Sequence, residues 1–166
     1  MGALTEPAFG EFYRQHARAL WLYVYRVTGN AADADDIVQE AFIRIASVEL
    51  REPGDEPLRR YLFRIAGNLV ADRWRRSNRE RRRLAPAAQH DIPVTEAPRD
   101  LDVVRTFAEL KPRERALLWL AYVEGDDHQS IAESLGVARG SVKVLLSRAR
   151  ARLRDLLKAR GFHART

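Results

Sequence analysis

Basic and hydroxyl side chains near the C-terminus follow a spacing that could bind nucleic acid. In residues 128–146, HQSIAESLGVARGSVKVLL, Ala132 stands four positions before Gly136. This spacing is typical of two helices that cross at a tight turn, because a small residue allows close approach and glycine adopts a positive φ at little cost. The polar face of the second helix would then suit the major groove. It carries Arg139, Ser141, Lys143, Ser147 and Arg148.

Apolar residues of the same segment support a helix-turn-helix. We expect Val142 to lie on the inward face of the second helix, where Leu145 could join it, while Val144 lies nearer the outward side. Ile131, Leu135 and Val137 complete the predicted buried set. The alternative is an ordinary helical hairpin whose basic face is only solvated.

A second group of polar and aromatic residues follows a predicted helix that begins near residue 58. Its arginines could bind phosphates, Asn68 and Asp72 could contact base edges, and two aromatic side chains could stack on a base drawn out of the duplex. Trp74 could instead pack in the core, and Asp72 could instead pair with a nearby arginine. The group comprises Arg60, Tyr61, Arg64, Asn68, Asp72, Trp74, Arg75 and Arg76.

The charge distribution favours a polyanionic partner. The chain has 166 residues and a net charge of +6. Seven arginines and one acid occupy residues 73–83, and eight basic residues and one acid occupy residues 139–160. Between them, residues 84–138 carry five basic and ten acidic residues. Two basic blocks indicate two contacts with a polyanion, and nucleic acid fits better than a membrane surface because no strongly amphipathic basic helix with an aromatic face is present.

Acidic side chains line one side of the second predicted helix. Asp36, Gln39, Glu40 and Ile43 follow the i, i+3, i+4, i+7 spacing of a single helix face. Carboxylates would not help this basic chain to bind DNA, whereas a basic protein partner could pair with them and bury Ile43. Two alternatives remain: a solvated helix face, and a divalent-metal site formed by Asp33, Asp36 and Glu40, which lacks convergent ligands.

Helical periodicity dominates the chain, which predicts an all-α fold. A first helix should begin near Thr5 and end at Gly29, and a second should begin at an Asn30 cap, with Asp33 in its first turn, and end near Val48. Residues 49–57 predict an exposed loop and residues 58–83 a third helix. The expected inward residues are Phe9, Phe12, Tyr13, His16, Leu20, Tyr23, Val24 and Val27, then Ile37, Val38, Ala41, Phe42 and Ile45, then Leu58, Leu62, Ile65, Ala66 and Leu69.

The C-terminal half should form a second helical domain. Residues 84–99 contain three prolines and no helical stripe, which predicts an extended linker. After it we expect a short helix over residues 101–110, a helix from Pro112 to near Gly125, a cap at Asp126 or Asp127, and a long last helix. The last helix keeps an inward stripe of Val142, Leu145, Leu146, Ala149, Leu153 and Leu156. The predicted organisation is domain 1–83, linker 84–100 and domain 101–166.

The composition gives no support to an enzyme. The chain has no cysteine, only four scattered histidines and no phosphate-cradling glycine loop, so we expect no catalytic residues, no metal ligands and no cofactor. The N-terminus lacks the basic and apolar regions of a secretory signal, and no apolar run is long enough for a transmembrane helix. We therefore expect a cytoplasmic protein without membrane insertion.

Three segments, in order, resemble the extracytoplasmic-function class of bacterial RNA polymerase sigma factors. Residues 26–45 (RVTGNAADADDIVQEAFIRI) are similar to the family's core-polymerase-binding segment, residues 61–76 (YLFRIAGNLVADRWRR) to its −10 element segment, and residues 110–154 to its −35 binding segment. The family directs promoter recognition, DNA melting and transcription initiation without ATP. The resemblance implies core RNA polymerase, through its β′ clamp helices and β flap, promoter DNA and an anti-sigma factor as partners.

The resemblance also assigns roles to the residues above. Asp33, Asp36, Gln39, Glu40 and Ile43 would bind the polymerase, and the group Arg60 to Arg76 would bind the −10 element. Arg139, Ser141, Lys143, Val144, Ser147 and Arg148 would bind the −35 element. In the family, the loop that corresponds to residues 49–57 captures a flipped base, and the linker threads a polymerase channel.

Two departures from the family pattern bear on promoter preference. Tyr61 stands where tryptophan is usual, and Val144 and Leu145 replace a common polar and basic pair after Lys143. Val144 could contact a thymine methyl group instead of forming a hydrogen bond. The competing interpretation is an autonomous regulator with one helix-turn-helix, which would bind duplex DNA tightly without polymerase.

Overall fold

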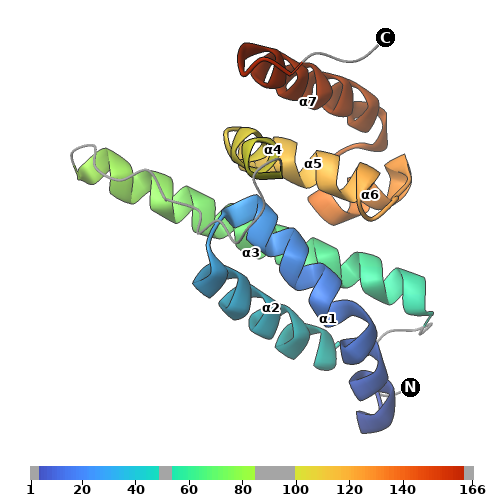
Figure 1. The fold of residues 1–166 in the computed structure, drawn as a ribbon. Coiled ribbons are helices and arrows are strands. Elements are labelled where there is room, and N and C mark those ends of the chain that lie inside the picture. The colour runs from blue at the N-terminus through green and yellow to red at the C-terminus, as the bar shows by residue number, and fades with distance from the viewer. Residues whose placement is uncertain (1–3, 49–53, 85–99, 163–166) are drawn as a thin grey trace.

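The computed structural model describes residues 4–48, 54–84 and 100–162, which form seven helices and no strand (Figure 1). The prediction of an all-α fold is therefore confirmed. Helices α1–α3 make up the N-terminal half, and α4–α7 make up the C-terminal half, which lies along one side of it. In the described residues, no helix is both long and apolar enough to cross a membrane.

The first two helices form an antiparallel pair whose boundaries follow from their caps. Helix α1 (Glu6–Thr28) ends at Gly29, which has a φ of 71°. Helix α2 (Ala31–Ala46) begins at Asn30, whose side chain accepts a hydrogen bond of 3.0 Å from the backbone of Asp33. Both caps were predicted, although α2 ends two residues before Val48. The prediction that Tyr13 points inward is wrong, since 47% of the residue is exposed.

Helix α3 (Asp55–Arg83) is the longest element and crosses the whole molecule (Figure 1). Of the loop predicted over residues 49–57, residues 49–53 lie outside the described part, and the prediction is wrong for Asp55 to Pro57, which are helical. Proline is compatible with the first turn of a helix, where its missing N–H has no helical partner. All five inward residues predicted for α3 are buried, as are Arg59, Phe63 and Val70, which the prediction missed.

The C-terminal half contains the predicted helix-turn-helix. Helices α4 (Asp100–Ala108) and α5 (Pro112–Tyr122) precede it, and α5 ends three residues before Gly125. Helix α6 (His128–Leu135) is capped by Asp127 and ends at Gly136, with a φ of 63°. Helix α7 (Arg139–Ala159) buries Val142 fully, while Leu135, Val137 and Leu145 are partly buried against the same core.

One hydrophobic core extends through both halves. It joins Tyr23 of α1 and Phe63 of α3 to Leu117 of α5 and Ile131 of α6. Helices α3 and α6 pack so closely that a Cβ atom on Gly67 would lie 3.1 Å from the carbonyl oxygen of Ser134. A smaller cluster of Leu110, Leu118 and Ala149 fixes α7 to α5. Residues 85–99 of the predicted linker lie outside the described residues.

Candidate nucleic-acid interface

The outward face of α7 presents its polar side chains to solvent. Val144 is 50% exposed among them, whereas Leu145 turns toward the core. Beyond this face, Arg150 donates a hydrogen bond of 3.0 Å to the hydroxyl of Tyr122, which ties α7 to the end of α5. The exposed residues include all six predicted to meet DNA, namely Arg139, Ser141, Lys143, Val144, Ser147 and Arg148. The outward face of α7 is therefore accessible to a DNA groove.

The predicted DNA-contacting group on α3 lies on the solvent side of that helix. Its members differ in their exposure and in whether they form ion pairs. Tyr61 and Trp74 are 37% and 47% exposed, so Trp74 is not a core residue. Asp72 accepts a hydrogen bond of 2.5 Å from Arg75, the alternative that the sequence had left open. Arg60 is only half-exposed, because it lies near Glu56 of α3 and Glu133 of α6. The remaining members, Arg64, Asn68 and Arg76, are exposed.

The acidic face of α2 is solvent-exposed and partly paired. Arg73 of α3 bridges to Asp33 and to Asp36, while Glu40 pairs with Arg44 at 2.5 Å. Asp33 and Asp36 thus share one cation and Glu40 pairs with another, so the three carboxylates do not converge on a single point, which argues against the metal alternative. Ile43 stands among them with 61% of its surface exposed.

A groove of about 730 Å³ runs beside this acidic face, between α1 and α2. Phe9, Tyr13 and Phe42 supply aromatic walls, and Gln39 and Ile43 of the acidic face also line it. The exposure of Tyr13 has its explanation here, since its ring lies 4.7 Å from that of Phe42 at the groove. Sequence periodicity placed Tyr13 in the core because a groove wall and a core position share the same helical spacing.

An ion cluster joins the two halves where α3 meets the turn that precedes α6. Arg59 of α3 donates hydrogen bonds to Asp126 at 3.0 Å and to Glu124 at 3.2 Å, both in the turn between α5 and α6. Its guanidinium also lies 4.7 Å from the ring centre of Phe63. Burial raises the pKa of the Asp126 carboxyl, against the opposing effect of Arg59. The sequence predicts Asp126 only as a possible cap, and Arg59 is not among the predicted site residues.

Two family models match the chain, one in each half. The family model described as Sigma-70 region 2 matches residues 12–80, and that described as Sigma-70, region 4 matches residues 100–153. The first match spans most of α1, all of α2 and all but the last residues of α3, and the second spans α4 to most of α7. Both the acidic face and the helix-turn-helix therefore lie inside matched regions.

Curated relatives match along most of the chain. It is 34% identical over 157 residues to the ECF RNA polymerase sigma factor SigL of Mycobacterium tuberculosis, with 90% of this chain and 88% of SigL covered. It is also 34% identical over 161 residues to the ECF RNA polymerase sigma factor SigE of Mycolicibacterium smegmatis. That match covers 91% of this chain and 62% of SigE, so the chain spans less than two thirds of that relative.

Two solved structures share the fold. The sigma factor RpoE in complex with the anti-sigma factor NepR, from Bartonella quintana, superposes with a TM-score of 0.69 and 25% identity, over 90% of this chain and 96% of that one. CnrH in complex with the cytosolic domain of CnrY superposes with a TM-score of 0.66 and 26% identity, over 93% of this chain and 90% of that one.

Proposed function

The chain belongs to the extracytoplasmic-function sigma factors, the initiation factors that direct bacterial RNA polymerase to promoters, and we propose that it performs this role through three separate faces. Residues 1–83 would hold core polymerase and the −10 element, residues 101–166 would hold the −35 element, and residues 84–100 would link them. The chain itself would be non-catalytic, without a cofactor, and would act in the cytoplasm.

The acidic face of α2 is the observation that carries the polymerase-binding proposal. A basic chain that exposes carboxylates around Ile43, an exposed apolar side chain, has a surface suited to a basic protein partner rather than to DNA. The neighbouring aromatic groove offers apolar area that a partner helix could cover. We assign this surface, formed by Asp33, Asp36, Gln39, Glu40 and Ile43, to the β′ clamp helices of the polymerase.

The exposed sides of α3 and α7 are proposed to read the two promoter elements. On α3, Tyr61 and Trp74 offer half-exposed rings for unstacked bases, and the arginines offer charge for phosphates. On α7, Val144 lies between basic residues and could contact a thymine methyl group. Asp72 and Arg75 already pair with each other, so we expect their contact with DNA to require exchange of that ion pair.

Simultaneous binding of both elements requires the two halves to separate. The −35 and −10 elements lie about 25 base pairs apart, roughly 85 Å at 3.4 Å per base pair. A compact chain of this length has a radius of gyration of only about 15 Å. In the packed arrangement α6 lies directly against α3 and is joined to the DNA-facing helix α7 by a short turn. We infer that the packed form is a resting state that opens on polymerase.

We expect an anti-sigma factor to stabilise the packed resting state. The solved relatives RpoE and CnrH are complexes with NepR and with the cytosolic domain of CnrY. We propose a partner of the same class for this chain, bound to surfaces that core polymerase would otherwise use.

A binding experiment separates this proposal from an autonomous regulator. Fluorescently labelled chain is titrated with core polymerase, and separately with duplex promoter fragments in the absence of polymerase. The proposal predicts saturable binding to core and only weak, salt-sensitive binding to duplex DNA. Tight sequence-specific duplex binding by the chain alone, with no binding to core, would favour the regulator.

A further inference from the structure

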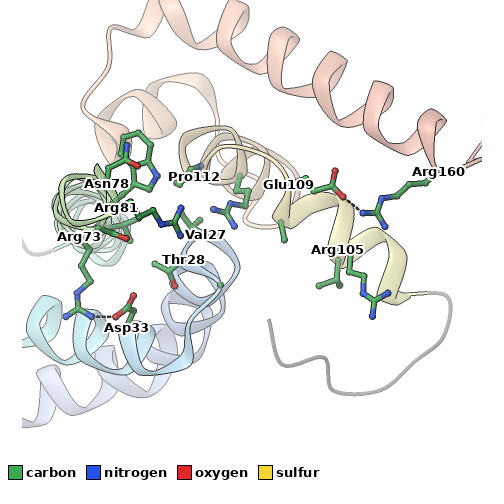
Figure 2. Close-up of a pocket in the computed structure, with 17 residues that line it drawn as sticks. Val27, Thr28, Asp33, Arg73, Asn78, Arg81, Arg105, Glu109, Pro112 and Arg160 are labelled. Carbon is green, nitrogen blue, oxygen red and sulfur yellow. Dashed lines mark hydrogen bonds and ion pairs between the residues drawn. The ribbon is translucent and has the colours of Figure 1, made fainter. Parts of the chain in front are cut away.

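A large cavity lies between the two halves, and two residues of its lining, Asp33 and Trp74, also belong to the proposed polymerase and promoter faces. It has a volume of about 1030 Å³. Figure 2 shows Arg73, Asn78 and Arg81 projecting from α3 on one side, with Arg105 of α4, Glu109 and Arg160 on the other. Counting Arg115 of α5, five arginines and two carboxylates line the cavity. This excess of positive charge indicates that the cavity suits an anion.

Two of these arginines already have carboxylate partners, and these partners are the two acidic residues among the described residues of the lining. Arg73 pairs with Asp33, and Arg160 pairs with Glu109 (Figure 2). Both of these carboxylates are thus already neutralised by an arginine of the protein. Among the described residues, no ion pair involves Arg105 or Arg115, so the charges of these two guanidinium groups must be balanced by solvent, by ions or by a ligand.

Arg115 is the member of the lining that most needs a partner. Only 8% of the residue is exposed, and its Nε atom is buried without a hydrogen-bond partner. Among the described residues, no ion pair involves its guanidinium. Burial lowers the pKa of Arg115 to about 10, since the charged form is desolvated without compensation. A buried cation without a partner is costly, so an anion in the cavity would relieve this cost.

We propose that the cavity binds a small phosphate-bearing molecule, whose phosphate oxygens pair with Arg115. Guanidinium groups match phosphate geometry with two parallel hydrogen bonds, and several arginines around one cavity favour a multiply charged phosphate over a single carboxylate. Trp74 also lines the cavity and is half-exposed, so an aromatic ring is available to a ligand that carries a base. The volume is at the upper end of the range of small-molecule sites.

Binding here would act on the resting state. Arg73, Trp74 and Arg81 belong to the N-terminal half, whereas Arg105 and Arg115 belong to the C-terminal half. A ligand that contacts both halves stabilises their packed arrangement and not the separated one. The effect on the resting state rests on the proposed sigma function, whereas the binding of the ligand does not. A failure of ligand binding can therefore be distinguished from a failure of the proposed function.

Calorimetric titration of the full chain tests the proposal, with inorganic pyrophosphate and ATP as probes at constant ionic strength. We expect one saturable site per chain and a ligand-dependent rise in Tm. Arg115→Gln should weaken binding about tenfold or more, because it removes a charged hydrogen-bond donor. Arg113→Gln is the matched control, since Arg113 is exposed on the same helix and does not line the cavity.

Three outcomes would overturn the proposal. The first is the absence of saturable binding by both probes. The second is equal weakening by Arg115→Gln and Arg113→Gln, which would indicate diffuse attraction to a basic surface. The third is a loss of folding in Arg115→Gln without ligand, which would show that the guanidinium already has a structural partner. The proposal instead expects the ligand-free Tm of Arg115→Gln to be unchanged or higher.

Discussion

Arg59 and Asp126 lie 67 positions apart in the chain, yet their side chains are hydrogen-bonded at 3.0 Å across the boundary between the two halves. Both side chains are largely buried, with 11% and 5% of their surfaces exposed. A buried ion pair contributes little net stability, but removal of one partner leaves the other charge buried and unpaired. The pair therefore makes the packed arrangement sensitive to a single substitution.

Arg59→Gln should shift the chain toward separated halves. The expected loss is about 3 kcal/mol of interaction between the halves, because Asp126 and Glu124 stay buried without their cation. The chain has no cysteine, so Ala32→Cys and Ala159→Cys provide two label positions, on α2 and α7, for distance measurement by energy transfer. Arg64→Gln, an exposed position on the same helix, is the control. Identical distance distributions in the two variants would contradict the assignment.

Asp126 should also give the chain a pH-dependent stability. Its pKa is raised above the ordinary value of 3.8, so the folded chain holds this proton more tightly than the unfolded chain. Stability contributed by Asp126 is then present at low pH and is lost as the pH rises from 3.8 through the raised pKa. Relative to Asp126→Asn, which does not titrate, the wild type should lose stability over that window. Urea unfolding of both proteins at a series of pH values measures the difference, and parallel curves would contradict it.

Local patterns predicted the helices and their caps better than the contacts between the halves. Gly29, Asn30 and Gly136 were identified because a cap depends on a few neighbouring residues. Arg59 was not identified, because together with Arg60 it has the pattern of a solvated basic face. Its partners Glu124 and Asp126 are 65 and 67 positions away in the sequence. Likewise, the cavity around Arg115 exists only where both halves meet, so no single segment encodes it.

The helix-turn-helix offers a matched pair of glycine substitutions. Gly136→Ala should destabilise the protein by about 1 kcal/mol, because its φ of 63° strains a residue that has a Cβ atom. Gly140→Ala should be neutral or stabilise by about 0.5 kcal/mol, since Gly140 is in helix α7 and a Cβ there meets nothing within 4 Å. Thermal unfolding measures both values. Equal effects of the two substitutions would be inconsistent with a left-handed residue at the turn.

Ile43 should matter for polymerase binding and not for folding. Ile43→Ser removes an exposed apolar side chain from the acidic face, so the free energy of unfolding should stay within about 0.5 kcal/mol of wild type. Loss of its burial in the complex should weaken core binding roughly tenfold. Val103→Ser, a similarly exposed apolar position on α4, controls for a general effect of lost hydrophobic surface. Competition for core against a labelled wild-type chain measures the affinities; unchanged competition by Ile43→Ser would remove Ile43 from the interface.

In vitro transcription measures whether this chain directs polymerase to initiate at promoters. The purified chain and bacterial core polymerase are incubated with a library of genomic fragments, with each protein omitted in turn. The proposed function predicts discrete transcripts only when both proteins are present. Asp36→Arg with Glu40→Arg should abolish these transcripts, because the reversed charges repel a basic partner, while Glu6→Arg with Glu11→Arg on α1 should leave them. Transcripts that persist in the α2 variant would contradict the assignment of the acidic face to polymerase binding, and a chain that never directs initiation would contradict the proposed function.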